Sequence, residues 1–201
     1  MGDSSTLEQL RSAGVGAYFR PRDVAPLGVS YHQVQKWVAD GSVEFHGKGL
    51  YRVADVEANE METIAMVASV VPHAIVCLLS ALRVHEIGTQ SPHQVWLAID
   101  RKARKPSQLP ASARIVRFSG PMLTYGVTTI SMLGAPVRIT SPARTVVDCF
   151  RYRNKIGLDV AMEALGDAVR SRKAPISEID RVADVCRISS VIAPYLAALS
   201  V

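Results

Sequence analysis

The chain has 201 residues, a formal net charge of +5, and 48% hydrophobic against 20% charged residues. This balance excludes an intrinsically disordered protein, and neither an internal repeat nor a low-complexity tract interrupts the sequence. The length allows either one domain or a module of roughly 50 residues joined to one of about 140. We expect a globular protein with a buried core.

The positive charge is distributed unevenly along the sequence. Residues 1–53 hold six Lys/Arg and five Asp/Glu, whereas residues 101–117 hold six Lys/Arg and no acidic residue. The first segment is therefore close to neutral, and its charge alone does not indicate nucleic-acid binding. An argument for DNA binding has to come from the pattern of residues instead.

The cysteines and the apolar segments indicate the compartment. Cys77, Cys149 and Cys186 lie far apart and form neither a CxxC pair nor an even-numbered framework, as is typical of buried thiols in a reducing environment. The start MGDSST lacks a basic segment followed by an apolar one, and a proline divides the apolar run 64–82. We therefore expect a cytoplasmic protein without a membrane span, a metal site or a cofactor.

The pattern over residues 20–40 predicts a helix-turn-helix. Val24 is the expected buried residue of the first helix, and Gly28 lies in the turn, where a left-handed backbone suits glycine. Ser30 is typical of a helix cap, and Val34 and Trp37 then follow at helical spacing on the inner side. A short connection of this kind sets the second helix at an angle that lets it enter a major groove.

The outer side of the second helix supplies the candidate base contacts. These are Tyr31, His32, Gln35 and Lys36, in the half of the helix that meets base edges in recognition helices. Gln35 can pair with adenine through two hydrogen bonds, and the other three side chains can reach bases or phosphates. An ordinary amphipathic helix with a solvated face is the alternative.

A hairpin pattern follows this helix. Apolar and aromatic residues between Val43 and Val53 flank the sequence His46-Gly47-Lys48-Gly49, which predicts two short strands with a cationic tip. A helix-turn-helix followed by such a hairpin is a winged helix. The candidate phosphate or minor-groove contacts are His46, Lys48 and Arg52, and Arg20 and Arg22 are candidate backbone clamps.

A second domain is expected over residues 55–201, after a winged-helix domain over residues 1–54. The expected elements are buried helices near 61–68 and 73–85 and strands at 94–100, 114–118, 127–132 and 137–139. Ser141 and Pro142 predict the start of a helix that continues to Phe150. The predicted fold class is α+β: an N-terminal winged helix-turn-helix, then a mixed α/β domain with a small sheet and several helices.

The strongest basic cluster of the chain lies between two of these strands. It consists of Arg101, Lys102, Arg104 and Lys105, a candidate nucleic-acid contact for which a solvated loop is the alternative. Asp100 with Lys102 matches the last part of a nuclease motif, but no second carboxylate stands at the usual interval before them. A Ser/His/Asp set in a recognisable context and a phosphate-binding loop are also lacking. We expect no catalytic residues, with a nuclease-like nucleic-acid enzyme as the alternative function.

Four segments, in this order, resemble a known family. LGVSYHQVQKWVADGSVEFHGKGLYRV is similar to the N-terminal winged helix of AbiEi-type antitoxins from bacterial type IV toxin-antitoxin systems, with its glycine-bearing turn, recognition helix and wing strand. LLSALRVHEIG, QVWLAID and ITSPARTVVDCF resemble the second domain of the same family. Together the resemblance covers most of the chain.

The resemblance implies a function and roles for several residues. It implies a transcriptional repressor that binds inverted repeats in its own operon and whose second domain counters a nucleotidyltransferase-like toxin without necessarily binding it. The outer residues of the recognition helix would read the operator, and Lys48 and Arg52 would hold its backbone. Arg144 and Asp148 match the motif of the second domain and, being four residues apart on one helix, are expected to form an internal ion pair. A winged helix that binds a protein partner instead of DNA is a third hypothesis, and the oligomeric state stays open.

Overall fold

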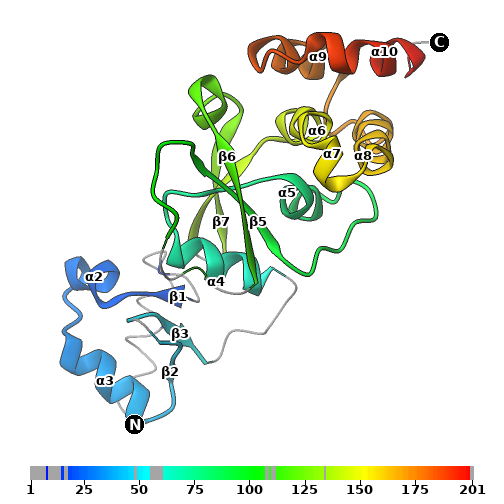
Figure 1. Cartoon of the computed structure of the whole chain (residues 1–201). Helices are drawn as coiled ribbons and strands as arrows, with labels where there is room; N and C mark the ends of the chain where they lie inside the picture. Colours follow the sequence, from blue (N-terminus) through cyan, green and yellow to red (C-terminus); the bar gives the residue numbers. More distant parts are fainter. Residues whose placement is uncertain are drawn as a thin grey trace. The chain divides into compact units, whose positions relative to one another are not determined.

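The structure, a computed structural model, describes residues 8, 15, 18–47, 49–54, 61–106, 109, 112–133 and 135–199. Over these residues the chain is a mixed α+β protein with nine α-helices and two sheets, which confirms the predicted α+β class (Figure 1). The chain divides into two compact units. The first comprises Met1–Pro72 and Ile130–Val137, and the second comprises His73–Thr129 and Arg138–Val201.

The first unit contains the two helices and the glycine turn predicted from the sequence. Helix α2 spans Pro21–Val24, and helix α3 spans Tyr31–Ala39 after a short 3-10 turn. Gly28 lies between them with φ of 82°, the left-handed conformation that glycine adopts without strain. The Ser30 hydroxyl accepts a hydrogen bond from the backbone N–H of Gln33 at 3.1 Å and so caps α3. These local predictions are confirmed.

A three-stranded antiparallel sheet follows the helices. Strands β2 (Val43–Phe45) and β3 (Tyr51–Val53) form the predicted hairpin, in which Val43 lies opposite Val53. Strand β1 (Tyr18–Phe19) pairs with the other edge of β3, so the strand order is β1-β3-β2. The sequence does not predict β1, because two residues show no alternation of polar and apolar positions.

Two small cores hold the first unit together. Trp37 packs with the buried residues Phe19, Val24, Val29, Val34, Val43, Tyr51 and Val53. On the other side of the sheet, Tyr18 and Leu50 contact Met66 and Val70 of helix α4 (Glu62–Val70) and Leu133. Burying one large apolar side chain contributes roughly 1.5–3 kcal/mol. Because α4 packs on this sheet, the first compact unit continues beyond residue 54, where the sequence suggests a boundary.

The second sheet has five strands in the order β6-β5-β4-β8-β7. Four of them correspond to the predicted strands: β5 (Val95–Asp100), β6 (Ala113–Phe118), β7 (Val127–Met132) and β8 (Ala135–Thr140). The central strand β4 (Ile75–Val76) lies where the sequence predicts a helix over residues 73–85. That prediction is wrong at its start, because this β-branched pair joins β5 in antiparallel and β8 in parallel pairing. Helix α5 (Leu78–Val84) begins only after it.

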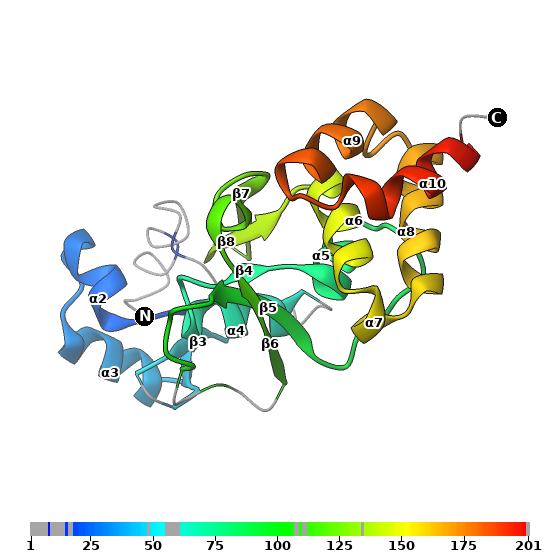
Figure 2. The same cartoon turned by 45° about the horizontal axis from the view of Figure 1, so that its top comes forward.

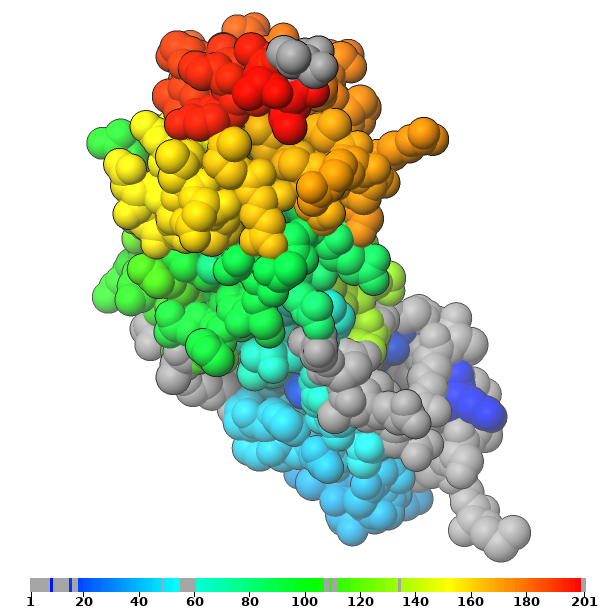
Figure 3. Space-filling view, turned by 90° about the vertical axis from the view of Figure 1, so that its right-hand side faces the viewer, coloured from blue at the N-terminus to red at the C-terminus, as the bar shows by residue number. Residues whose placement is uncertain are grey.

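Helices cover the remainder of the second unit. They are α5, α6 (Pro142–Arg151), α7 (Arg153–Ile156), α8 (Leu158–Arg170), α9 (Ile176–Val185) and α10 (Ser189–Leu199). Helix α6 contacts the other five, lies beside α8 in both ribbon views, and buries eight of its ten residues (Figure 2). The space-filling view shows the helices after residue 142, coloured yellow to red, closely packed against one another (Figure 3).

Two further expectations concern this unit. The Ser141 hydroxyl accepts a hydrogen bond from the backbone N–H of Arg144 at 3.3 Å, which confirms the predicted helix start at Ser141 and Pro142. The three cysteines are buried and free, as expected. Among the helices of the described residues, none has the length and apolar character needed to cross a bilayer.

Candidate nucleic-acid interface

The four predicted base-contacting residues lie on the exposed side of α3. The Tyr31 side chain is 61% exposed, and His32, Gln35 and Lys36 are exposed as well. Val34 and Trp37 point the other way and are fully buried, so the apolar face of the helix fixes which residues face outward. The helix therefore presents these four side chains together, as the sequence predicts.

A buried tyrosine of the hairpin holds Gln35 in place. The Gln35 Nε2 donates a hydrogen bond to the Tyr51 hydroxyl at 3.0 Å. Burial raises the pKa of Tyr51, and its interaction with Tyr31 raises it further, so the phenol stays protonated. A glutamine side chain has two N–H donors and one acceptor oxygen. One donor and the oxygen of Gln35 are thus left for another partner while Tyr51 fixes the amide plane.

An aromatic side chain that sequence reasoning missed lies next to this group. The Phe45 ring is 56% exposed and contacts the Tyr51 ring, with 5.2 Å between the ring centroids. Val43 and Phe45 are two residues apart, so strand alternation predicts that both face the same, buried side. The sequence therefore gives no signal for the exposure of Phe45. Tyr31 and Phe45 both add exposed aromatic surface next to Tyr51.

Arg52 forms ion pairs with two carboxylates of the first unit. Its side chain is only 11% exposed, and its guanidinium donates to the Glu62 carboxylate at 2.7 Å and to the Glu44 carboxylate at 3.4 Å. The Tyr18 hydroxyl also donates to Glu62 at 2.7 Å, and this bond, with the guanidinium, lowers the pKa of Glu62. Since its charge is taken up by these carboxylates, we leave Arg52 out of the proposed contacts.

The tip of the hairpin carries the remaining predicted cations of this segment. His46 lies at the start of the turn, with its Nε2 3.3 Å from the Glu44 carboxylate and its ring edge-on to Tyr18. Gly47 and Gly49 have φ of 83° and 72°, as a tight turn with glycines requires. Lys48, between them, lies outside the described residues.

Arg20 and Arg22 flank the start of α2. The Asp23 carboxylate accepts a hydrogen bond from the backbone N–H of Arg20 at 2.8 Å and lies 3.6 Å from the Arg22 Nε. Arg22 is exposed, whereas Arg20 is half-buried. The two arginines therefore lie together near one carboxylate, in the same unit as α3.

The basic cluster of the second unit lies in the turn after β5. Its four cations, Arg101, Lys102, Arg104 and Lys105, are all exposed. The Asp100 carboxylate accepts a hydrogen bond from the backbone N–H of Lys102 at 2.8 Å, and Arg117 donates to the Ala103 carbonyl at 2.5 Å. Asp100 thus shapes this turn. Within the described part of the chain, no group of three or more His, Cys, Asp or Glu is placed to hold a metal ion.

The Arg144–Asp148 pair is the internal ion pair that the sequence predicts. Its Nε and Oδ1 are 3.0 Å apart, and both side chains are fully buried. The Arg144 guanidinium also donates to the carbonyls of Tyr125 at 2.5 Å and Met122 at 3.0 Å. Burial raises the pKa of Asp148 to about 6, although Arg144 acts in the opposite direction. The pair joins α6 to the loop before β7 and has a structural role.

Comparison with known proteins adds no identification. No model of a known protein family matches the sequence, and no curated protein matches it either.

Proposed function

We propose that the chain is a DNA-binding transcriptional repressor whose first unit acts as a winged helix, with α3 as the recognition helix and the β2–β3 hairpin as the wing. The observation that carries this proposal is the exposed side of α3, where Tyr31, His32, Gln35 and Lys36 lie together. The helix begins directly after a left-handed glycine turn and is followed by an antiparallel hairpin. Helices in this setting insert their N-terminal half into the major groove.

The side chains on α3 have distinct roles in this proposal. Gln35, oriented by Tyr51, presents its amide to adenine, which offers one acceptor and one donor in the major groove. Lys36 and His32 reach phosphates or base edges, and Tyr31 contacts a sugar or a thymine methyl group. The near-neutral charge of residues 1–53 makes these few contacts decisive, because a large electrostatic attraction is lacking.

The same protein acts, in our proposal, as an antitoxin in the bacterial cytoplasm and counters a nucleotidyltransferase-like toxin. Its support is the resemblance of four segments, in order, to AbiEi-type antitoxins. A nucleotidyltransferase gene should lie beside the gene for this chain. Expression of that neighbour alone should stop growth, and co-expression of this chain should restore it. A lone gene, or a neighbour that this chain does not neutralise, would remove the antitoxin part of the proposal.

DNA recognition is tested with the full chain and a labelled duplex taken from the region upstream of its own gene. Gln35→Ala should weaken binding to this duplex by about 1–3 kcal/mol and leave binding to a shuffled duplex nearly unchanged. Lys36→Ala should weaken binding to both duplexes. Lys155→Ala, a substitution of an exposed lysine in the second unit, is the matched control. If Gln35→Ala and Lys36→Ala both bind like the unaltered protein, the assignment of α3 is wrong.

A further inference from the structure

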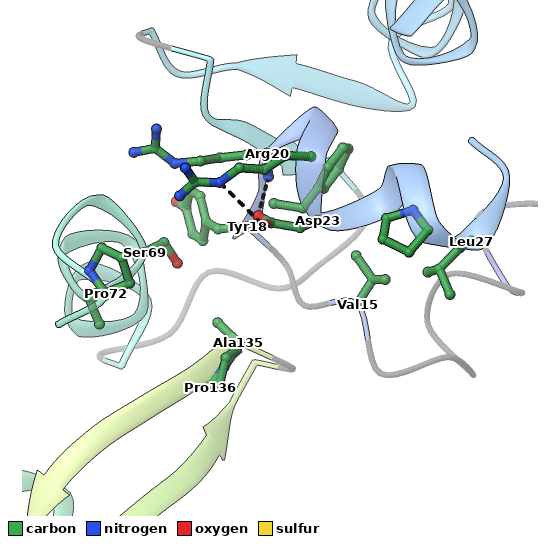
Figure 4. A pocket seen from close by; sticks show the side chains of 13 residues that line it. Val15, Tyr18, Arg20, Asp23, Leu27, Ser69, Pro72, Ala135 and Pro136 are labelled. Carbon is green, nitrogen blue, oxygen red and sulfur yellow. Dashed lines mark hydrogen bonds and ion pairs between the residues drawn. The ribbon is translucent and has the colours of Figure 1, made fainter. Parts of the chain in front are cut away.

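A cavity of about 430 Å³ lies in the first unit, beside the start of the helix-turn-helix segment (Figure 4). Three parts of the chain form its walls: Val15 with residues from the range 18–27, the end of α4 with Pro72, and the start of β8. Pockets that bind small molecules have volumes of roughly 300–1,000 Å³ and combine an apolar lining with a few polar groups. The size of this cavity is therefore suited to a small organic ligand.

The lining separates an apolar part from a charged part. The apolar side chains include Phe19, Leu27, Ala68, Pro72, Ala135 and Pro136. The charged side chains are Arg20, Arg22 and Asp23, and Figure 4 shows Arg20 and Asp23 together on one side, away from Ala135 and Pro136. A ligand that fits this division has an apolar body and one charged end.

The charged part favours an anion. Two arginines and one aspartate give it a formal charge of +1, and Asp23 lies near both arginines through the contacts described above. The Nε of Arg20 is buried and has no hydrogen-bond partner among the described residues. The Nε is closed off from the cavity, so an acceptor on a ligand would meet the terminal nitrogens of the guanidinium instead. The balance of one positive charge matches a singly charged anion.

We propose that this cavity binds a small organic monocarboxylate with an apolar body. The carboxylate pairs with the guanidinium of Arg20, which offers parallel N–H donors in the geometry that a carboxylate accepts. The apolar body displaces water from the exposed apolar walls formed by Leu27, Pro72 and Pro136. The Ser69 hydroxyl, which donates to the Ala65 carbonyl at 2.8 Å, accepts a further hydrogen bond from a ligand that carries a donor.

Occupation of the cavity has a regulatory consequence that rests on the proposed function. Arg20 and Arg22 are the candidate backbone clamps of the DNA-binding segment, and a carboxylate bound there neutralises their charge. A bound carboxylate therefore weakens DNA binding. The binding of the carboxylate itself does not depend on whether the protein binds DNA.

The test is a calorimetric titration of the full chain with naphthalene-2-carboxylate and with its neutral counterpart, naphthalene-2-carboxamide. We expect saturable one-to-one binding of the carboxylate and at least about tenfold weaker binding of the amide, since only the carboxylate forms the charge-assisted pair. Arg20→Gln should weaken carboxylate binding by about the same factor and leave amide binding unchanged. Ala135→Leu, which fills the cavity, should weaken both.

Controls separate the cavity from general effects of charge and folding. Arg114→Gln removes an exposed arginine of the second unit and should bind the carboxylate like the unaltered protein. Thermal unfolding shows whether each variant is folded. If Ala135→Leu does not fold, the affinities of Arg20→Gln for carboxylate and amide still test the proposal. Absence of carboxylate binding, equal affinity for carboxylate and amide, or an unchanged affinity in Arg20→Gln would overturn the proposal.

A parallel DNA titration distinguishes failure of this proposal from failure of the proposed function. If Arg20→Gln loses DNA affinity but the unaltered protein does not bind the carboxylate, the arginine contacts only the DNA backbone and the ligand proposal is wrong. If the carboxylate binds as expected and the protein does not bind DNA, the cavity is a ligand site and the repressor function is wrong.

Discussion

Substitutions in the buried pair Arg144–Asp148 should act in a strongly non-additive way. Arg144→Met removes the 3.0 Å contact with Asp148 and the two hydrogen bonds to carbonyls, and it leaves a fully buried carboxylate without a counter-charge. An uncompensated buried charge of this kind costs about 3–5 kcal/mol of unfolding free energy. Asp148→Leu leaves the buried Arg144 guanidinium without its counter-charge, and we expect a loss in the same range, about 3–5 kcal/mol.

The double variant Arg144→Met/Asp148→Leu should lose much less than the sum of the single losses. It removes both charges, and exchange of a buried ion pair for apolar side chains is often close to neutral. The carbonyls of Met122 and Tyr125 still lose their donor, which costs about 1–3 kcal/mol for an unsatisfied buried group. The two substitutions are therefore coupled through the pair.

The single variant Arg144→Met should also depend on pH in a defined direction. Burial raises the pKa of Asp148 to about 6 in the presence of Arg144, and loss of that cation raises it further. A carboxyl group whose pKa is raised by folding adds stability at low pH, and this stability is lost as the pH rises through the pKa of the folded state. Arg144→Met should thus be less destabilised at about pH 5 than at about pH 8.

Urea unfolding followed by circular dichroism measures these free energies. Arg170→Met serves as the control, because Arg170 is 77% exposed and lies 3.7 Å from Asp167, and a surface pair contributes only about 0–1 kcal/mol. Single losses that add to within about 0.5 kcal/mol in the double variant would refute the reasoning. So would a destabilisation by Arg144→Met that is the same at both pH values.

Three further predictions concern half-buried groups. Glu62→Gln should lower the unfolding free energy by about 1–3 kcal/mol in chemical denaturation, because the carboxylate accepts hydrogen bonds from both a tyrosine and an arginine, and unchanged stability would contradict this. Gly126→Ala should cost about 1–3 kcal/mol in the same assay, because φ is 64° and the new Cβ would lie 2.9 Å from the Cβ of Arg144; a neutral effect would show that the loop adapts. Burial lowers the pKa of His85 below 6.5, so the unfolded chain takes up a proton first and stability falls as the pH drops through about 6.5. His85→Gln should make that fall shallower in thermal unfolding between about pH 7 and pH 5, and an identical fall would exclude this role.

The elements that could be predicted from the sequence are those with local signals. The glycine turn at Gly28 and the helix starts at Ser30 and Ser141 depend on backbone conformation and capping within a few residues, and all three are present in the structure. Strands β1 and β4 have two residues each and exist only through pairing with distant strands. Their positions therefore could not be deduced from periodicity.

The candidate site shows the same division between local and distant information. The outer side of α3 follows from helical spacing, so the exposure of Gln35 and its neighbours could be predicted. Arg52 stands in a cationic hairpin, but its partner Glu62 lies in helix α4, and no local pattern shows that the two meet. The cavity was also inaccessible to sequence reasoning, because residues as distant as Arg20 and Ala135 form its walls.

The first unit is not encoded by a single continuous stretch of the gene. Residues Ile130–Val137 belong to it, and within them Leu133 packs on Tyr18 and Leu50 while Ala135 lines the cavity. A fragment that ends after Pro72 would lack this packing, and a recombination event that exchanges only the N-terminal part would join mismatched surfaces. Replacement of the N-terminal part alone would therefore disturb this packing, whereas point substitutions on the exposed side of α3 would leave it intact.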